Sequence, residues 1–319
     1  MIIAPLKSIL SSRESLRTIL SLLVLVVAVF GVGLLAIRHE NLQKIALELK
    51  AKENTVPVTP NAFMNMQITG DAAIVYDLTN GTVLFSQNSE KQLPLASLTK
   101  LLTVYGASEI LSKTSRVTIS KEALLEDGDS GLSESETFSF ADLARFTLVA
   151  SSNDGAEAIA ETARNSRGLN TQQLMTAVAS AVGLTRTYAL NSTGLDVSTT
   201  SAGAFGSAHD IAVLSGAVLS SAPDIAKATI EPSVRMVAED GTVHSLKNTN
   251  QDVSHVPGLL LSKTGYTDLA GGNLVIVFDA GIGHPVSIVV LGSTKEARFT
   301  DVEKLISATL AQFAGLPAH

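Results

Sequence analysis

A stretch of twenty consecutive residues without a charge, residues 18–37, divides the chain into a short leading segment and a long remainder. A helix of this length spans about 30 Å, the thickness of the hydrocarbon core of a bilayer. A buried helix of a globular core is a poorer explanation, because the stretch has no amphipathic stripe. A cleavable signal peptide would end in small residues, whereas this stretch ends in Ile37-Arg38-His39-Glu40. We therefore expect an uncleaved membrane anchor that contacts the lipid bilayer.

The basic residues beside this stretch say little about its orientation. Three precede it and four follow it before residue 53, so the positive-inside rule favours a cytoplasmic N-terminus only slightly. Charged helix formers and then Val56-Pro57-Val58-Thr59-Pro60 come after the stretch, which is typical of a juxtamembrane helix and a stiff linker. We expect four parts: a cytoplasmic segment at 1–17, a single transmembrane helix at 18–37, a linker at 38–66 and one folded domain at 67–319.

Composition excludes several classes of function. The net charge of −7 is not that of a nucleic-acid-binding surface, which needs clustered Lys and Arg. The absence of cysteine excludes disulfides, thiolate metal sites and a thiol nucleophile. The six histidines show no metal-ligand spacing. We expect no metal, no cofactor and no nucleic-acid partner.

Strand-like segments lie at both ends of the expected domain, and helical segments lie between them. Residues 72–78 and 82–86 flank Asn80-Gly81, which predicts a hairpin with a type I′ turn. Apolar runs with strand character return after residue 255, and a last amphipathic helix is expected at about 294–313. Helices should begin near Ser97, Ser139 and Asp154. This order predicts an α+β domain whose antiparallel sheet joins the two chain ends.

The helix expected near Ser97 carries the chain's only S-x-x-K pattern, Ser97-Leu98-Thr99-Lys100. Residues three apart share one side of a helix, so the Ser97 hydroxyl and the Lys100 amine can touch. Lys100 can act as a base for a Ser97 nucleophile only if burial or a second cation lowers its pKa. Taken alone, the pattern is better explained by a helix cap followed by a solvated lysine.

Two further patterns carry candidate site residues. Ser151-Ser152-Asn153 lies at an expected turn between helices, where Ser151 could relay a proton and Asn153 could orient a substrate amide or Lys100. Simple helix capping explains it equally well, and we interpret the similar Ser86-Gln87-Asn88 as structural. Lys263-Thr264-Gly265 ends a strand-like run, and its glycine would let another chain approach closely. Lys263 would help to keep Lys100 neutral and would attract a carboxylate together with Thr264. A strand end followed by a turn is the structural alternative.

Together the three patterns occur in penicillin-binding proteins and class A β-lactamases. The chain resembles the serine-type D-alanyl-D-alanine carboxypeptidases, the low-molecular-mass penicillin-binding proteins of peptidase family S11, from about Gln67 to its C-terminus. The resemblance rests on these segments: Ala96-Ser97-Leu98-Thr99-Lys100, Ala150-Ser151-Ser152-Asn153-Asp154, Asn191-Ser192-Thr193-Gly194-Leu195-Asp196, Ser207-Ala208-His209-Asp210 and Lys263-Thr264-Gly265-Tyr266-Thr267-Asp268-Leu269-Ala270-Gly271-Gly272-Asn273.

The resemblance implies a β-lactamase/transpeptidase-like fold, an antiparallel sheet flanked by helices with a helical subdomain. It also implies a peptidoglycan stem peptide ending in D-Ala-D-Ala as substrate, and β-lactam antibiotics as inhibitors. Such an enzyme would act in cell-wall synthesis and cell shape, with its catalytic domain on the extracytoplasmic face of the cell membrane.

The resemblance also implies a role for each matching residue. Ser97 would form the acyl-enzyme, Lys100 would be the general base, and Ser151 with Lys263 would pass a proton to the departing D-alanine. Substrate binding would fall to Lys263, Thr264, Gly265 and Tyr266, and the N–H groups of Ser97 and Tyr266 would form the oxyanion hole. Some family members hold an arginine where this chain has Asn248-Thr249-Asn250, so carboxylate binding would rest on Lys263, Thr264 and Thr267.

Three alternatives stay open. A class A β-lactamase carries a glutamate on a separate loop, but here the one E-x-x-x-N pattern, Glu161 to Asn165, lies in the helix after Asn153, where we expect a solvated face. A D,D-endopeptidase would use the same residues on a different substrate. A non-catalytic wall-binding membrane protein would have no need of the nucleophile and its base.

Overall fold

The computed structural model describes residues 17, 20–23, 38, 43–44 and 61–316. The chain divides into two compact units, Met1–Thr59 and Pro60–His319. In the first unit the described residues are helical, and the Ser21 hydroxyl donates to the Arg17 carbonyl at 2.9 Å. No helix in the described part of the chain is long and apolar enough to cross a membrane. The expected span at 18–37 lies mostly outside the described residues.

A five-stranded antiparallel sheet forms the centre of the second unit, in the order β10-β11-β12-β1-β2. Its strands are β1 (Ala72–Asp77), β2 (Thr82–Gln87), β10 (Leu259–Thr267), β11 (Gly271–Asp279) and β12 (Pro285–Ser293). Strand β1 lies between β2 and β12, with Ala72 paired to Leu291 and Asp77 to Val286. The prediction that one sheet joins the two ends of the domain is therefore confirmed.

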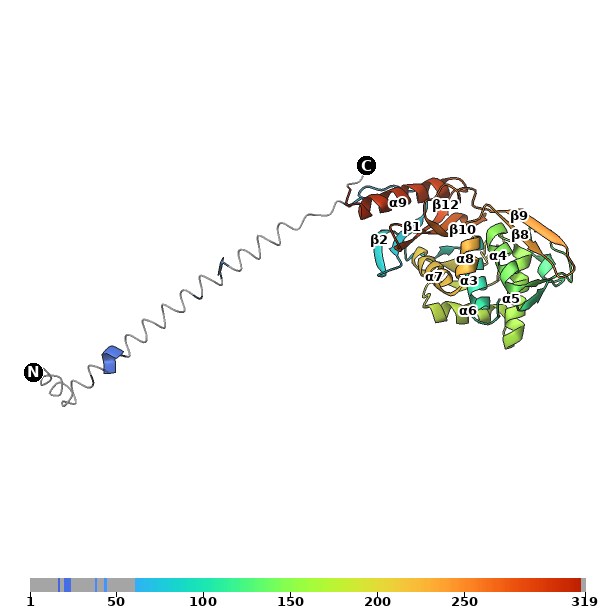
Figure 1. The fold of residues 1–319 in the computed structure, drawn as a ribbon, viewed down its shortest axis with the longest axis horizontal. Coiled ribbons are helices and arrows are strands. Elements are labelled where there is room, and N and C mark those ends of the chain that lie inside the picture. Colours follow the sequence, from blue (N-terminus) through green and yellow to red (C-terminus); the bar gives the residue numbers. More distant parts are fainter. Residues whose placement is uncertain (1–16, 18–19, 24–37, 39–42, 45–60, 317–319) are drawn as a thin grey trace, which may run out of the picture. The chain divides into compact units, whose positions relative to one another are not determined.

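The sheet separates two hydrophobic layers, because alternate residues of each strand point to opposite faces. Ile74 and Val275 belong to the larger hydrophobic core, which they share with the helices from the middle of the sequence. Val75 and Ile276 belong to the smaller core, which they share with the C-terminal helix α9. Figure 1 shows α9 along one side of the sheet and α3, α7 and α8 on the other. The helices are α3 (Thr99–Ser108), α4 (Phe140–Ala150), α5 (Asn153–Arg167), α6 (Thr171–Val182), α7 (Ala208–Ser221), α8 (Pro223–Ala228) and α9 (Ala297–Phe313).

Polar caps fix where the central helices begin. The Ser139 hydroxyl accepts from the Asp142 N–H and starts α4, and the Ser152 hydroxyl accepts from the Gly155 N–H and starts α5. Both starts were predicted. Near Ser97 the helix begins differently, since a 3-10 turn at Ala96–Leu98 precedes α3.

The hairpin between β1 and β2 forms, but the predicted type I′ turn is wrong. Gly81 has a φ of 72°, whereas Asn80 is not among the residues with positive φ. The Asp77 carboxylate accepts from the Thr79 N–H and the Asn80 side chain from the Thr82 N–H, both at 2.9 Å. These side-chain acceptors stabilise a longer loop, closed by the Gly81 N–H on the Asp77 carbonyl at 2.9 Å.

Smaller sheets complete the unit and carry the loops around the candidate site. They comprise β3 (Leu93–Pro94), β7 (Ala204–Gly206) and β6 (Tyr188–Ala189) in one sheet, β4 (Arg116–Thr118) with β5 (Thr137–Ser139), and β8 (Ser233–Val237) with β9 (Val243–Lys247). Packing of the unit begins before residue 67, because Ala62 and Phe63 are buried against the α9 side. The Ala62 N–H donates to the Gln312 side chain at 2.9 Å.

Candidate active site

Ser97 lies in the 3-10 turn that leads into α3, half-buried between the sheet and the helices. The residue before it, Ala96, has a φ of 48°, a left-handed conformation that costs a non-glycine residue about 1–3 kcal/mol. Surrounding contacts hold it there: the Thr99 hydroxyl donates to the Ala96 carbonyl at 2.7 Å. Strand β10 also packs closely, since a Cβ built on Gly265 would lie 3.2 Å from the Ser97 nitrogen. Because Gly265 has no Cβ, the turn that carries Ser97 can pack directly against β10.

Lys100 is the base that the spacing predicted to reach Ser97. Its Nζ lies 2.8 Å from Ser97 Oγ and 3.0 Å from the Thr193 carbonyl oxygen. The side chain is fully buried, and burial lowers the pKa of Lys100 to about 7, although Glu126 and Asp154 act in the opposite direction. A lysine with this pKa is substantially neutral near pH 7 and can accept a proton from Ser97.

The second pattern places its two functional side chains differently. Ser151 ends α4 in a left-handed conformation, φ 60°, and its Oγ lies 2.9 Å from Lys263 Nζ. Asn153 donates to the Asp127 carbonyl at 2.5 Å, and its buried Oδ1 has no partner. The expected contact between Asn153 and Lys100 is therefore not formed. Its Oδ1 is an acceptor without a partner, and its role toward a substrate amide stays a prediction.

Lys263 projects from β10 beside Ser151 and also donates to the Thr264 carbonyl at 2.8 Å. Burial, with a smaller contribution from the Lys100 charge, holds the pKa of Lys263 well below its ordinary value. We expected Lys263 to keep Lys100 neutral; burial is instead the main cause of the low Lys100 pKa. A fully buried lysine without a carboxylate partner gains most when an anion binds beside it.

The hydroxyl groups near Lys263 differ from those expected to bind a carboxylate, which were Thr264 and Thr267. Thr264 donates to the Thr249 hydroxyl at 2.7 Å, so Thr249 joins the site from the segment where no arginine stands. Thr267 donates to the Asp196 carboxylate at 2.9 Å. Its hydroxyl proton is therefore already used, and the expectation that Thr267 helps to bind a carboxylate is not supported.

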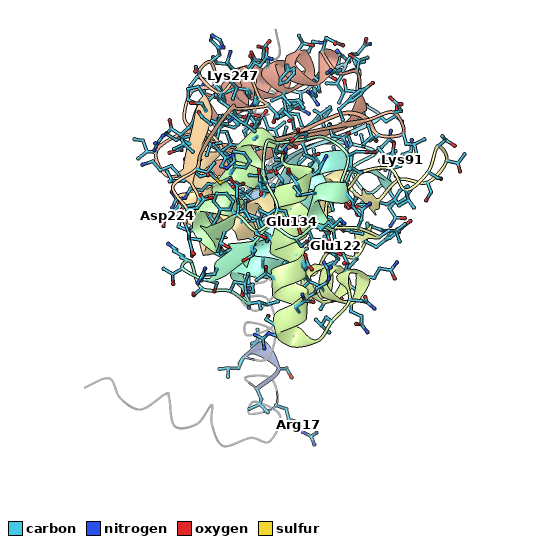
Figure 2. The ribbon with its side chains drawn as sticks, turned by 90° about the vertical axis from the view of Figure 1, so that its right-hand side faces the viewer. Arg17, Lys91, Glu122, Glu134, Asp224 and Lys247 are labelled. Atoms are coloured by element: carbon cyan, nitrogen blue, oxygen red, sulfur yellow. The ribbon has the colours of Figure 1, made fainter. Side chains whose placement is uncertain are left out.

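The sequence did not predict that the acidic residue Glu126 lies near Lys100. Glu126 lies in the segment between β4 and β5, and the Thr193 hydroxyl donates to its carboxylate at 3.2 Å. Burial and the nearby Glu157 charge raise the pKa of Glu126. By contrast, Glu122 and Glu134 of the same segment lie at the outer surface (Figure 2). Only the folded position of Glu126, and no motif, distinguishes it from these surface glutamates.

Replacing Glu126 by glutamine is expected to move the pH dependence of Ser97 acylation to lower pH. The Glu126 charge raises the Lys100 pKa, so its removal leaves more Lys100 neutral below pH 7. The rate of acylation, measured from pH 5 to 8, should show its half-maximum at a lower pH than in the wild type. Glu122→Gln is the matched control, because Glu122 lies in the same segment at the outer surface and is not among the groups that act on Lys100. An unchanged profile for Glu126→Gln would show that this carboxylate does not act on the base.

Two further patterns have structural roles. Ser86 lies at the end of β2 and donates to the Ser89 hydroxyl at 2.8 Å, as the structural interpretation of Ser86-Gln87-Asn88 predicted. Glu161 lies within α5, as predicted; it is half-buried, and Asn165 of the same pattern is exposed. The Glu161 carboxylate accepts from the Ser120 hydroxyl at 2.6 Å and holds the segment after β4 against the helix.

Comparison with known proteins agrees with this geometry. The sequence model of the D-alanyl-D-alanine carboxypeptidase family S11 matches residues 57–295. The chain is 28% identical to D-alanyl-D-alanine carboxypeptidase DacF of Bacillus subtilis, over 78% of this chain and 64% of that protein. It is 30% identical to DacC of Escherichia coli, over 74% of this chain and 60% of that protein. The chain thus spans less than two thirds of the length of these relatives.

A solved structure shows the same fold. Penicillin-binding protein D2 of Listeria monocytogenes, in its ampicillin-bound form, superposes with a TM-score of 0.66 at 30% identity, over 77% of this chain and 98% of that one. The β-lactamase/transpeptidase-like fold expected from the sequence is therefore confirmed for the second unit. The family match covers more than half of the chain and includes all three patterns that meet around Ser97. The chain belongs to the D-alanyl-D-alanine carboxypeptidase family of serine peptidases.

Proposed function

We propose that this protein is a serine D-alanyl-D-alanine carboxypeptidase that removes the terminal D-alanine of peptidoglycan stem peptides. The observation that carries the proposal is the 2.8 Å contact between Ser97 Oγ and Nζ of a buried Lys100 whose pKa is lowered to about 7. A serine hydroxyl needs such a base at neutral pH, whereas a wall-binding module does not. The matched family and the named relatives support the same activity.

Acylation follows from the positions of the two lysines. Neutral Lys100 takes the Ser97 proton as Oγ attacks the carbonyl carbon between the two D-alanines. The N–H groups of Ser97 and Tyr266 then stabilise the oxyanion. Ser151, in contact with Lys263, gives a proton to the departing amine, and the C–N bond breaks. The products of this step are free D-alanine and an ester on Ser97, which water hydrolyses to release the shortened peptide.

The substrate carboxylate is placed beside Lys263. The Lys263 ammonium group and the Thr249 hydroxyl, which accepts from Thr264 and keeps its own proton, lie together beside the edge strand β10. An anion there would compensate the buried charge of Lys263, which gives affinity for a C-terminal carboxylate or for the carboxylate of a β-lactam. The ampicillin and cefotaxime complexes of the Listeria protein support β-lactam binding.

We place the protein in the cell membrane with one span at 18–37. The apolar length of this stretch supports the placement, and a peptidoglycan substrate requires the catalytic unit on the extracytoplasmic face. The N-terminus would then be cytoplasmic. Treatment of intact spheroplasts with a protease should remove the catalytic unit and spare residues 1–17; protection of the catalytic unit would contradict this orientation.

An intact-mass time course with benzylpenicillin tests the activity. The full chain in detergent, mixed with the drug, should gain the mass of one penicillin and keep it for many minutes, because a D,D-peptidase releases this acyl group slowly. Ser97→Ala should gain no mass. Release of free D-alanine from a synthetic peptide ending in D-Ala-D-Ala, absent in Ser97→Ala, completes the test.

The same experiment distinguishes the alternatives. A short-lived adduct with rapid drug hydrolysis would indicate a β-lactamase. A stable adduct without D-alanine release, combined with cleavage of cross-linked dimeric stem peptides, would indicate an endopeptidase. Folded protein that forms no adduct would contradict acyl transfer and favour a wall-binding protein.

A further inference from the structure

Arg298, in the first turn of α9, carries a buried guanidinium group directly behind the proposed oxyanion site. The residue is only 6% exposed. Its Nη1 donates to the Gly265 carbonyl at 2.6 Å and, at 3.4 Å, approaches the Asn273 carbonyl of β11. Its Nε is buried without a partner. No carboxylate hydrogen-bonds to this guanidinium within the described residues, although burial of an uncompensated cation is expensive. A purely structural link between α9 and the sheet would need no charge at this position.

The carbonyl that Arg298 contacts belongs to the peptide unit between Gly265 and Tyr266. This unit also contains the Tyr266 N–H, and the described chain contains no cis peptide bond. In a trans peptide the C=O and N–H point in opposite directions. Arg298 contacts both β10 and β11, so it lies on the β11 side of the carbonyl. The Tyr266 N–H therefore points to the other side of β10, which is the open edge of the sheet.

Ser97 lies close to this peptide unit. The 3-10 turn packs against β10, and a Cβ on Gly265 would come within 3.2 Å of the Ser97 nitrogen. The peptide unit 265–266 thus separates a buried cation on one side from the nucleophile on the other. A hydrogen bond from a charged donor to a carbonyl polarises the whole peptide unit and strengthens its N–H as a donor.

We propose that Arg298 is a positioning residue that orients and polarises the 265–266 peptide, so that the Tyr266 N–H stabilises the oxyanion formed during Ser97 acylation. The inference rests on the acyl transfer proposed above. The Arg298 charge acts electrostatically on the site, since it is one of the causes that lower the pKa of Lys263. Because the interaction strengthens as negative charge develops on the oxyanion, it should act on the rate of acylation more than on binding.

Arg298→Met and Arg298→Lys test this role, with Arg145→Met as the matched control. Arg145 also has a buried, unpartnered Nε, but it lies in α4, its side chain is 41% exposed, and its Nη1 pairs with the Asp142 carboxylate at 3.5 Å. Acylation by benzylpenicillin is followed by rapid mixing, which separates the dissociation constant of the first complex from the acylation rate constant. We expect Arg298→Met to lower the rate constant about tenfold, a fraction of the 10²–10³-fold loss on removal of an oxyanion-hole donor, with an unchanged dissociation constant. Arg298→Lys keeps the charge and should recover most of the loss.

Infrared spectroscopy of the penicillin adduct provides a readout that loss of stability would not move. The acyl carbonyl, identified by 13C labelling, should absorb at higher wavenumber in Arg298→Met than in the wild type, because a weaker oxyanion hole polarises it less. Arg298→Lys should lie between them, and Arg145→Met should match the wild type. An acylating Arg298→Met protein with the wild-type rate constant and carbonyl frequency would overturn the inference. If Arg298→Met fails to fold, Arg298→Gln takes its place, with the same expected loss of rate and the same shift of the carbonyl frequency. A wild-type rate and frequency in Arg298→Gln would overturn the inference. A wild-type protein that forms no adduct would instead overturn the proposed function.

Discussion

Replacing Lys100 by methionine is expected to slow acylation of Ser97 about 10³-fold, within the range of 10²–10⁴ that a positioned general base contributes. Methionine has a length similar to that of lysine and carries no charge that would have to be buried. The decrease in the acylation rate therefore measures the loss of the proton acceptor. The wild-type rate should rise with pH and reach half of its maximum near pH 7, because Lys100 acts in its neutral form. The measurement is the rate of the mass increase with benzylpenicillin between pH 5 and 9.

Lys113→Met serves as the control for this experiment. Lys113 is exposed and pairs with Asp224 at the surface, so its loss should leave the rate and the profile unchanged. Acylation of Lys100→Met within tenfold of the wild-type rate would show that another group takes the Ser97 proton.

The same substitution should change the pH dependence of stability. The pKa of Lys100 is about 7 in the folded state and about 10.5 in the unfolded chain, so the unfolded chain binds more protons between these pH values. The free energy of unfolding of the wild type should therefore rise with pH across this window, by up to about 5 kcal/mol from Lys100. Lys100→Met should lack this increment and keep the rise that comes from Lys263. Urea unfolding of both proteins at pH 7 and pH 10 measures the difference.

Gly194→Ala is expected to destabilise the catalytic unit by about 3 kcal/mol and to disrupt the position of Ser97. Gly194 has a φ of 78°, and a Cβ there would lie 1.9 Å from the Ala96 carbonyl oxygen. The left-handed conformation costs alanine about 1–2 kcal/mol, and displacement of the Ala96 backbone costs at least as much again. Because Ala96 precedes the nucleophile, acylation should slow in whatever protein remains folded.

Gly183→Ala separates the cost of the left-handed conformation from the cost of the clash with the Ala96 backbone. Gly183 has nearly the same φ, 80°, but no atom lies within 4 Å of its added Cβ. This variant should lose only the conformational part of the stability and should acylate at the wild-type rate. Thermal unfolding and penicillin labelling of both variants give the comparison, and equal losses would mean that the Ala96 contact does not matter.

Local patterns predicted the parts of the site that depend on short-range geometry. The three-residue spacing of Ser97 and Lys100 was sufficient to predict their contact, and the Ser139 cap to predict where α4 begins. The turn at Asn80-Gly81 was predicted wrongly, because the acceptor side chains of Asp77 and Asn80 override the dipeptide preference.

Local sequence patterns could not predict the contacts between segments that are distant in the sequence. The Thr193 carbonyl, the Glu126 carboxylate and the Arg298 guanidinium reach the site only through tertiary packing. An arginine in the first turn of an amphipathic helix normally indicates a solvated face, and nothing near it in sequence marks it as buried. The presence of Thr249 in the site also depends on the path of the chain after β9.

The pairing of β1 with β12 determines when this protein can complete its fold during synthesis. Strand β1 is made early and lies buried between two neighbours, yet one of those neighbours comes from the last part of the chain. Until residues 285–293 emerge, the β1–β2 hairpin presents an open edge, and α9 has not yet been synthesised. The nucleophile segment, helices α3 to α8 and both lysines are all synthesised before this closure. A ribosome stalled before Pro285 would therefore hold every catalytic group of the site on a chain whose central sheet is still open.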